Sequence, residues 1–260
     1  MKKFILNRAF CSSVQLSGSD FHYLARVRRL GPGDVFNAVF SDSTEAQLTV
    51  VSVSHDALLA ECLPLPKAAV PSIPPIYLFQ ALPKGAKMDL IVRQAAEAGV
   101  TEIAPFISEH SAPEAGKEKT GRWKRIIREA RQQSGSSIET TVRDTCCLDE
   151  LLKYWEELNI PEKSGAGIVL HQDPLEPGTF HDYLSNTPGF VAVAVGPEGG
   201  FSPAEAGRFM AAGFRPLALG GTILRTETAA LYGVAAIRTL LTESASWLLK
   251  KNLPRSRGEE

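Results

Sequence analysis

The sequence predicts an α/β chain in which a small β-rich unit precedes a larger domain of alternating strands and helices. Two observations carry this prediction. Strand-like, β-branched segments fill the first seventy residues, and after residue 75 apolar strand segments alternate with segments of helical period. Between them lies a proline-rich stretch, residues 64–75, which marks a domain boundary because proline lacks a backbone N–H and fixes φ.

The N-terminal unit is predicted from three strand segments, a turn and a helix. Val35–Val39 and Gln47–Val53 are rich in β-branched residues, and Leu58–Leu63 is a third strand candidate. Gly31–Asp34 is typical of a turn, and a short helix is expected over Ser19–Leu30.

In the second domain, predicted strands and helices alternate. The strands expected there cover Ile76–Leu82, Thr101–Phe106, Ile168–His171, Phe190–Gly196 and Arg215–Leu219. The spacing of apolar residues predicts helices over Lys87–Ala98, Arg122–Ser134, Asp149–Leu158 and Thr226–Leu241. Another helix begins after Ser202, which has a proline next to it and a glutamate three residues later. The alternation indicates a doubly wound α/β domain.

Length and composition are those of a globular protein. The chain has 260 residues, of which 44% are hydrophobic and 22% charged, and these values exclude disordered and fibrous classes. No apolar run approaches the roughly 20 residues that cross a bilayer, and the N-terminal apolar stretch is too short for a signal peptide. The four cysteines include no CxxC pair, so we expect a cytoplasmic protein without a metal.

Charge is sorted along the chain, although the net charge is only −1. Residues 1–34 carry six basic groups against two acidic ones, and residues 117–131 carry seven against two. Residues 144–205 instead carry eleven acidic groups against two basic ones. Such sorting is compatible with a phosphate-facing surface, but each basic run also fits the solvated side of a helix.

Two loops at strand ends are the candidate functional sites. The first, Gly196–Gly200, follows a buried strand, and ligands of open α/β sheets bind at the carboxyl ends of the strands. Its glycines allow the backbone to approach a ligand, and Glu198 adds a carboxylate. The loop also fits an ordinary strand-to-helix turn, and it matches neither a dinucleotide fingerprint nor a P-loop.

The second loop, Leu219–Ala229, leaves a strand and enters the last helix. Thr226 could act as a helix cap and Glu227 as a partner of the helix dipole, which are structural roles. Arg225 is harder to explain in this way, because a guanidinium beside an apolar pocket often binds a planar, oxygen-rich group.

Together the two loops resemble the C-terminal signatures of the SPOUT superfamily of S-adenosylmethionine methyltransferases. Within it, the chain resembles the RsmE family, which methylates N3 of uracil in 16S ribosomal RNA. The stretches His22–Asp34, Gln80–Asp89 and Glu129–Gly135 are similar to further segments of that family, so the resemblance covers nearly the whole chain.

This resemblance implies a PUA-like RNA-binding β-barrel over residues 1–70, a SPOUT methyltransferase domain with a C-terminal trefoil knot over 75–245, and a tail over 246–260. It also implies S-adenosylmethionine as cofactor, 16S ribosomal RNA in the small ribosomal subunit as partner, and a homodimer without a membrane or a metal. The cofactor-binding residues that it implies are Leu170, His171, Gly196, Pro197, Glu198, Gly199, Gly200, Leu219, Gly220, Ile223, Leu224, Arg225, Thr226 and Ala229.

The implied chemistry assigns roles to two side chains. Methyl transfer needs the donor carbon and the acceptor nitrogen in line and about 3 Å apart. Uracil N3 carries a proton and is a poor nucleophile until that proton leaves. We expect Arg225 to stabilise the developing negative charge on the uracil oxygens. Glu198 is the other expected catalytic residue, although the sequence does not choose between it, Glu227 and water as the proton acceptor.

The side chains expected to contact RNA are Arg26, Arg29, Lys84, Lys87 and Arg93. Phosphate contacts would make the affinity for RNA fall steeply with salt. Arg93 is also spaced to pair with Glu97, four residues further along the same helix.

Two departures from the family pattern bear on RNA binding. Ser136 stands where the family often has an arginine after its Gln-Ser-Gly segment, and His110 stands where it often has an arginine after Ser/Thr-Glu. Both changes remove a charge that would face RNA, so two other functions stay open. One is a sister SPOUT enzyme acting on another base or on a ribose, and the other is a non-catalytic RNA-binding ribosome assembly factor. Binding of S-adenosylmethionine would separate the last from the two enzymes.

Overall fold

The computed structural model of the chain describes residues 3–42, 44–66, 73–111, 120–160, 164–172, 180–184 and 188–252. The chain divides into two compact units, one of residues 1–69 with 128–139 and one of residues 70–127 with 140–260. Within the described ranges, no helix combines the length and the apolar character that a membrane crossing requires.

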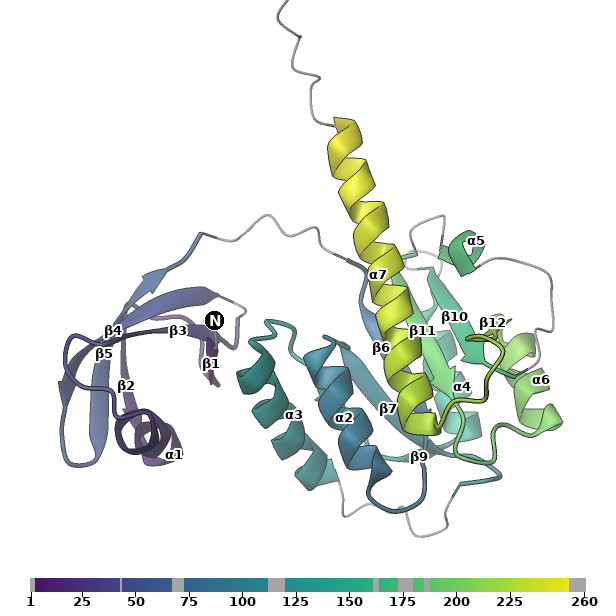
Figure 1. Cartoon of the computed structure of the whole chain (residues 1–260), viewed down its shortest axis with the longest axis horizontal. Coiled ribbons are helices and arrows are strands. Elements are labelled where there is room, and N and C mark those ends of the chain that lie inside the picture. Colours follow the sequence, from purple (N-terminus) through teal and green to yellow (C-terminus); the bar gives the residue numbers. More distant parts are fainter. Residues whose placement is uncertain are drawn as a thin grey trace, which may run out of the picture. The chain divides into compact units, whose positions relative to one another are not determined.

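A mixed five-stranded sheet is the framework of the first unit (Figure 1). Its strands follow the order β1-β3-β4-β5-β2, in which β1 is parallel to β3 and the other neighbours are antiparallel. Alternate residues of β2 and β4 are buried, as the period of a half-buried strand requires. The strands are β1 Lys3–Leu6, β2 Ser13–Ser17, β3 Val35–Phe40, β4 Glu45–Val53 and β5 Ala57–Pro64. The three expected strands are confirmed, and β1 and β2 were not predicted.

The helix expected over residues 19–30 begins as α1, Gly18–Phe21, and continues as a π-helix, η1, His22–Val27. The backbone N–H of Leu30 closes the end of this helix by donating to the carbonyl of Leu24 at 3.0 Å. Arg29 lies in the closing turn with φ = +57°, and among the described residues it is the one non-glycine with positive φ. A left-handed arginine is strained, and π-helical turns often accompany functional sites.

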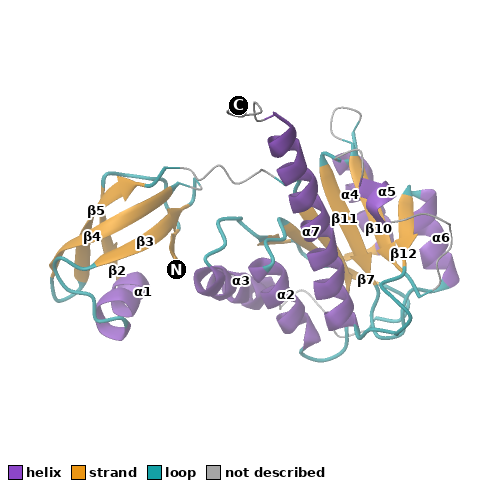
Figure 2. Ribbon diagram, turned by 45° about the horizontal axis from the view of Figure 1, so that its top comes forward, coloured by secondary structure: helices purple, strands orange, loops and turns teal. Residues whose placement is uncertain are grey.

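The second unit is built on a parallel seven-stranded sheet (Figure 2). Its order is β12-β10-β11-β6-β7-β8, and β9 also pairs with β7; every pairing is parallel. The strands are β6 Ile76–Ala81, β7 Glu102–Ile107, β8 Thr141–Val142, β9 Cys146–Cys147, β10 Gly165–Leu170, β11 Phe190–Val195 and β12 Phe214–Leu217. Strands β6 and β11 are buried along their whole length, which agrees with their continuous apolar sequences.

Helices cover both faces of this sheet, as the alternating pattern predicts. On one face, α7 contacts α2 as well as strands β6 and β11. On the other face, side chains of α4 and α6 pack with aromatic side chains of the strands. The helices are α2 Lys87–Glu97, α3 Thr120–Ser134, α4 Leu148–Leu158, α5 Phe180–Leu184, α6 Pro203–Ala211 and α7 Thr226–Asn252. The short elements β8, β9 and α5 were not predicted, and α7 extends beyond the predicted end at residue 241.

The face under α4 and α6 has an aromatic core. The ring of Trp155 on α4 lies 4.6 Å from that of Phe214, and Phe209 on α6 lies 5.1 Å from the same ring. Rings at such separations make favourable contacts beyond the burial of their area. This core fixes the strands, and so it fixes the loops at their carboxyl ends.

The expected domain boundaries stay predictions. Residues 67–72 of the proline-rich stretch and the last eight residues of the expected tail lie outside the described residues. The trefoil knot also stays a prediction.

Candidate active site

A cavity lies where three neighbouring strands of the second unit end. Leu170 is the last residue of β10, Val195 that of β11 and Leu217 that of β12, and all three line it. The two loops singled out in the sequence form its remaining walls. Ligands of open α/β sheets bind at this edge, where the order of the strands changes direction.

Most of the expected cofactor residues come together in this cavity. Those that line it are Leu170, His171, Gly196, Pro197, Glu198, Gly200, Leu219, Gly220, Ile223, Leu224, Thr226 and Ala229. Gly199 and Arg225 are not among the lining residues. The walls also include residues that the sequence did not single out, namely Gln172, Val195, Leu217, Gly221 and Thr222.

Gly199 is exposed, but one side of it lies against a side chain that follows another strand. A Cβ atom at this position would lie 2.9 Å from the Cβ atom of His110, so a larger residue would force one of the two to move. The Nδ1 atom of His110 lies 3.1 Å from the carbonyl oxygen of Gly200. His110 therefore supports the loop 196–200, a contact that its sequence position did not reveal.

A buried carboxylate ties the same region to α6. Glu205 accepts hydrogen bonds from the backbone N–H of Ser202 at 3.0 Å and from that of Glu109 at 2.8 Å. In return, the Ser202 hydroxyl accepts from the backbone N–H of Glu205 at 3.3 Å. This capping box confirms the predicted helix start, and the contact with Glu109 joins the start of α6 to the loop after β7.

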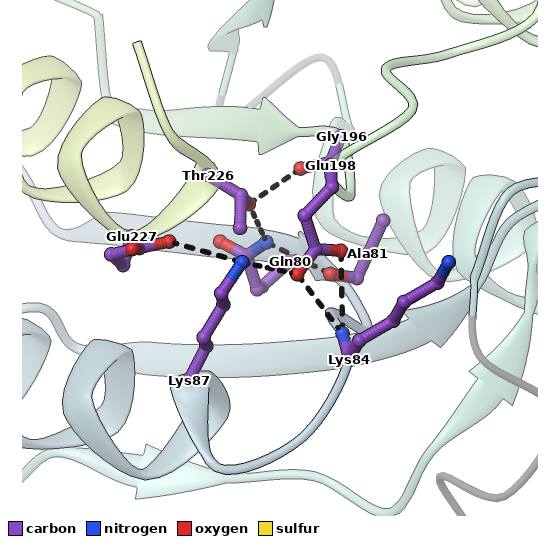
Figure 3. Close-up of polar contacts among 8 residues, drawn as sticks. All are labelled: Gln80, Ala81, Lys84, Lys87, Gly196, Glu198, Thr226 and Glu227. Carbon is purple, nitrogen blue, oxygen red and sulfur yellow. Dashed lines mark hydrogen bonds and ion pairs between the residues drawn. The ribbon is translucent and has the colours of Figure 1, made fainter.

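A polar brace crosses the site from β6 to α7 (Figure 3). Gln80 faces α7 in a strand that is otherwise apolar, and its Nε2 donates to the carbonyl of Ala81 at 2.8 Å and to the Thr226 hydroxyl at 3.1 Å. The Thr226 hydroxyl donates in turn to the carbonyl of Gly196 at 2.6 Å. The brace fixes both cavity loops to β6. Gln80 was not predicted as a site residue, although it begins the family-like stretch Gln80–Asp89 and is the one amide in an otherwise apolar strand.

Glu198 is held by donors from the loop after β6 and from the first residue of α2 (Figure 3). The Lys87 ammonium lies 2.6 Å from Glu198 Oε1, and the backbone N–H of Lys84 lies 3.2 Å from the same oxygen. Burial raises the pKa of Glu198, but the hydrogen bonds from Lys87 and from backbone N–H groups outweigh it, and the pKa lies below its ordinary value. A carboxylate in this state is a weak base.

Glu227, the other candidate acceptor, is less fully bound. It lies in the first turn of α7, and its Oε2 atom is buried with no hydrogen-bond partner among the described residues. The nearest cation is the Lys87 ammonium at 4.0 Å, which is beyond hydrogen-bond distance.

Arg225 stands just outside the cavity, between the lining residues Leu224 and Thr226. Its side chain is exposed, and among the described residues it has neither a hydrogen-bond partner nor an ion-pair partner. A guanidinium that is exposed at the rim and unpaired within the described part of the chain is available to a ligand that approaches from outside.

The expected RNA contacts lie in different surroundings. In the first unit, Arg26 reaches the carbonyl of His55 at 3.4 Å, and Arg29 occupies the strained turn after η1. In the second unit, Lys84 and Arg93 are exposed. Lys87 instead lies beside Glu198.

Two family models match the chain. An RNA methyltransferase domain matches residues 71–238, and an RNA methyltransferase PUA domain matches residues 16–62. The first match includes both cavity loops and the Gln80 brace.

Relatives and solved structures of the same kind are similar over most of the chain. The ribosomal RNA small subunit methyltransferase E of Synechocystis is 31% identical over 88% of this chain and 74% of its own length. The protein of that name from Bacillus subtilis is 29% identical over 86% of this chain and 89% of its own length. The crystal structure of the one from Neisseria gonorrhoeae, bound to S-adenosyl methionine, superposes with a TM-score of 0.79 at 27% identity, covering 92% of this chain and 98% of that one.

Proposed function

Because this chain belongs to the ribosomal RNA small subunit methyltransferase E family of RNA methyltransferases, we propose that it transfers a methyl group from S-adenosylmethionine to N3 of a uracil in 16S ribosomal RNA. The observation that carries the proposal is the cavity at the ends of β10, β11 and β12, which both family-like loops line. The small ribosomal subunit is the proposed substrate and the cytoplasm the proposed location.

The cavity suits the proposed cofactor. Its walls combine leucine, isoleucine and valine side chains with exposed glycine backbone, and such walls accept the flat face of a base while peptide groups bond to its edge. The expected cofactor residues that line the cavity are proposed to hold it there. When bound, S-adenosylmethionine supplies an electrophilic methyl group.

The residues of the chain have three tasks in the proposed reaction. Arg225, free at the rim, places its positive charge against the uracil oxygens that become negative when N3 loses its proton. The proton goes to Glu227 or to water, because Glu198 is held by Lys87 and Lys84 and is a weak base. The polar brace from Gln80 to Thr226 keeps the two loops in place.

RNA is proposed to contact basic residues of both units, namely Arg26, Arg29, Lys84 and Arg93. A homodimer is also proposed. In its support, Ile223 is 77% exposed at the mouth of the cavity and Tyr232 on α7 is 54% exposed, and a second copy that covers them would remove their apolar area from water. Analytical ultracentrifugation tests the dimer. A sedimentation coefficient that matches a 28.1 kDa monomer at all concentrations would exclude it.

The decisive experiment is transfer of labelled methyl from S-adenosylmethionine to small ribosomal subunits that lack the modification. Nuclease digestion and mass spectrometry then identify the modified nucleoside. The proposal predicts 3-methyluridine at a single site. Another methylated nucleoside would indicate a sister enzyme, and absence of both transfer and S-adenosylmethionine binding would indicate a binding factor.

A further inference from the structure

Lys87 is a basic residue that lies beside carboxylates, unlike a side chain that is open to RNA. Its ammonium lies 2.6 Å from Glu198 Oε1 and 4.0 Å from Glu227 Oε2. These residues come from three segments, namely the start of α2, the loop after β11 and the first turn of α7. Because two carboxylates already offset the positive charge of Lys87, this side chain attracts an RNA phosphate only weakly.

The position of Lys87 in its own helix is unfavourable. Lys87 is the first residue of α2, and a cation at a helix N-terminus opposes the helix dipole. The stability of α2 therefore does not explain the presence of a lysine there. An interaction outside the helix does, and the contact with Glu198 is the shortest one that Lys87 makes.

We propose that Lys87 is a positioning residue of the cofactor site, whose ammonium holds the Glu198 carboxylate and with it the loop 196–200. The side chain of Glu198 is 27% exposed and that of Lys87 36%, so solvent screens their attraction only in part. Gly196, Pro197, Glu198 and Gly200 form one wall of the cavity. Without the ammonium, Glu198 keeps the backbone N–H of Lys84 but loses its only paired cation within 4.0 Å among the described residues.

This inference rests on the proposed function, because it assigns Lys87 to the binding of S-adenosylmethionine. A role in cofactor binding and a role in RNA binding can be distinguished by measurement. Loss of one phosphate contact lowers the slope of log affinity against log salt by about 1. Loss of a positioning contact leaves that slope unchanged and instead lowers the affinity for the cofactor.

Lys84 provides a matched control. It carries the same charge three residues earlier in the same segment, but its side chain is exposed, and among the described residues only its backbone N–H reaches Glu198. Lys84→Met therefore removes a charge from the surface without touching the contact with Glu198. Lys87→Arg keeps the charge and serves as the conservative rescue.

The test is calorimetric titration of S-adenosylmethionine into the wild type, Lys87→Met, Lys84→Met, Lys87→Arg, Glu198→Gln and the double variant Lys87→Met/Glu198→Gln. We expect Lys87→Met to weaken binding about 3- to 10-fold and to raise KM for the cofactor more than it lowers kcat. Lys84→Met should leave cofactor binding unchanged, and Lys87→Arg should recover most of the loss. In the Glu198→Gln background, Lys87→Met should have little further effect, because its partner is already gone.

Binding of small ribosomal subunits as a function of KCl completes the experiment. Lys87→Met should keep the wild-type salt slope, and thermal unfolding should show that it is folded. Two results would overturn the inference, provided that the wild type binds S-adenosylmethionine. One is that Lys87→Met binds the cofactor as tightly as the wild type does, and the other is that this variant shows a lower salt slope. A wild type that does not bind S-adenosylmethionine would overturn the proposed function itself.

Discussion

At the scale of single residues, Arg225 has the largest part in the proposed chemistry, because it stabilises the negative charge that develops on the uracil. Because it stands outside the cavity, Arg225→Ala should spare most of the affinity for S-adenosylmethionine. It should lower kcat about 100- to 1000-fold, the range for removal of a group that stabilises a developing anion. Single-turnover methyl transfer and calorimetric binding measure the two quantities.

Arg208→Ala is the control for that variant. Arg208 lies on α6, pairs with Asp149 on the face opposite α7, and should not affect kcat. Loss of cofactor binding in Arg225→Ala, with normal folding, would assign Arg225 to cofactor binding instead of chemistry.

Thr226 tests the buried brace. Its hydroxyl both accepts from Gln80 and donates to the Gly196 carbonyl. Thr226→Val therefore removes the Gly196 contact and one of the hydrogen bonds of Gln80 Nε2, which keeps its bond to the Ala81 carbonyl, and should lower the free energy of unfolding by about 1–3 kcal/mol. Thr226→Ser keeps the hydroxyl and loses one methyl group, which should cost about 1 kcal/mol or less. Urea unfolding of both variants makes the comparison, and equal losses would show that the hydroxyl contributes nothing.

Glu198 sets the pH range over which the cavity keeps its form. Its pKa in the folded protein lies below the ordinary value. The contacts of Glu198 therefore contribute fully above the unfolded pKa of about 4.3, and they are lost only as the pH falls through the lower, folded pKa. Binding of S-adenosylmethionine should show no change from this group between about pH 6 and pH 9. Calorimetry of the wild type and of Glu198→Gln across that range checks it, since a transition found only in the wild type would contradict the assignment.

At the scale of elements, the end of η1 holds Arg29 in a strained left-handed turn. Arg29 adopts the left-handed conformation that glycine adopts more readily, so Arg29→Gly should leave the free energy of unfolding unchanged or raise it by up to about 1 kcal/mol. If Arg29 contacts an RNA phosphate, the same variant should lower the salt slope of RNA binding by about 1. Urea unfolding and salt-dependent binding measure both effects, and an unchanged slope would remove Arg29 from the proposed RNA surface.

The loop 196–200 depends on the strand end beside it. Gly199→Ala would place a methyl group 2.9 Å from His110 Cβ, so it should displace the loop and weaken the binding of S-adenosylmethionine. Gly207→Ala on α6 is the control, because its Cβ would meet no atom within 4 Å. In the His110→Gly background, which lacks both this side chain and its contact with the Gly200 carbonyl, Gly199→Ala should have little further effect on affinity, and an undiminished loss there would show that the Cβ contact does not limit the loop.

At the scale of the whole molecule, local patterns predicted the framework and long-range pairing completed it. Continuous apolar runs predicted β6 and β11, and the helical spacing of apolar residues predicted α7, because each of these elements buries a regular set of side chains. The strands β1 and β2 were missed since they are short, and η1 was predicted as an ordinary helix.

The site was predicted to a similar extent and for a similar reason. Two contiguous loops, each visible as a string of residues, supplied most of the cavity wall. The contacts that hold them in place join Gln80 to Thr226, 146 positions apart, and Lys87 to Glu198, 111 positions apart. No local pattern encodes such pairs, which is why the contact of Lys87 with Glu198 was not predicted.

The order of the strands has a consequence for how the protein is made. Strand β6 opens the second unit, yet its neighbour β11 follows only after a long stretch of chain, and Gln80 is 115 residues away from Val195, beside which it lies. At a synthesis rate of about 5–20 residues per second, the nascent strand waits roughly 6–23 seconds for this neighbour. The cavity needs the start of α7 as well, so it can close only when nearly the entire polypeptide has emerged. A product that ends before Leu219 therefore lacks one wall of the cavity, and competence to bind the methyl donor requires that translation has passed the first turn of α7.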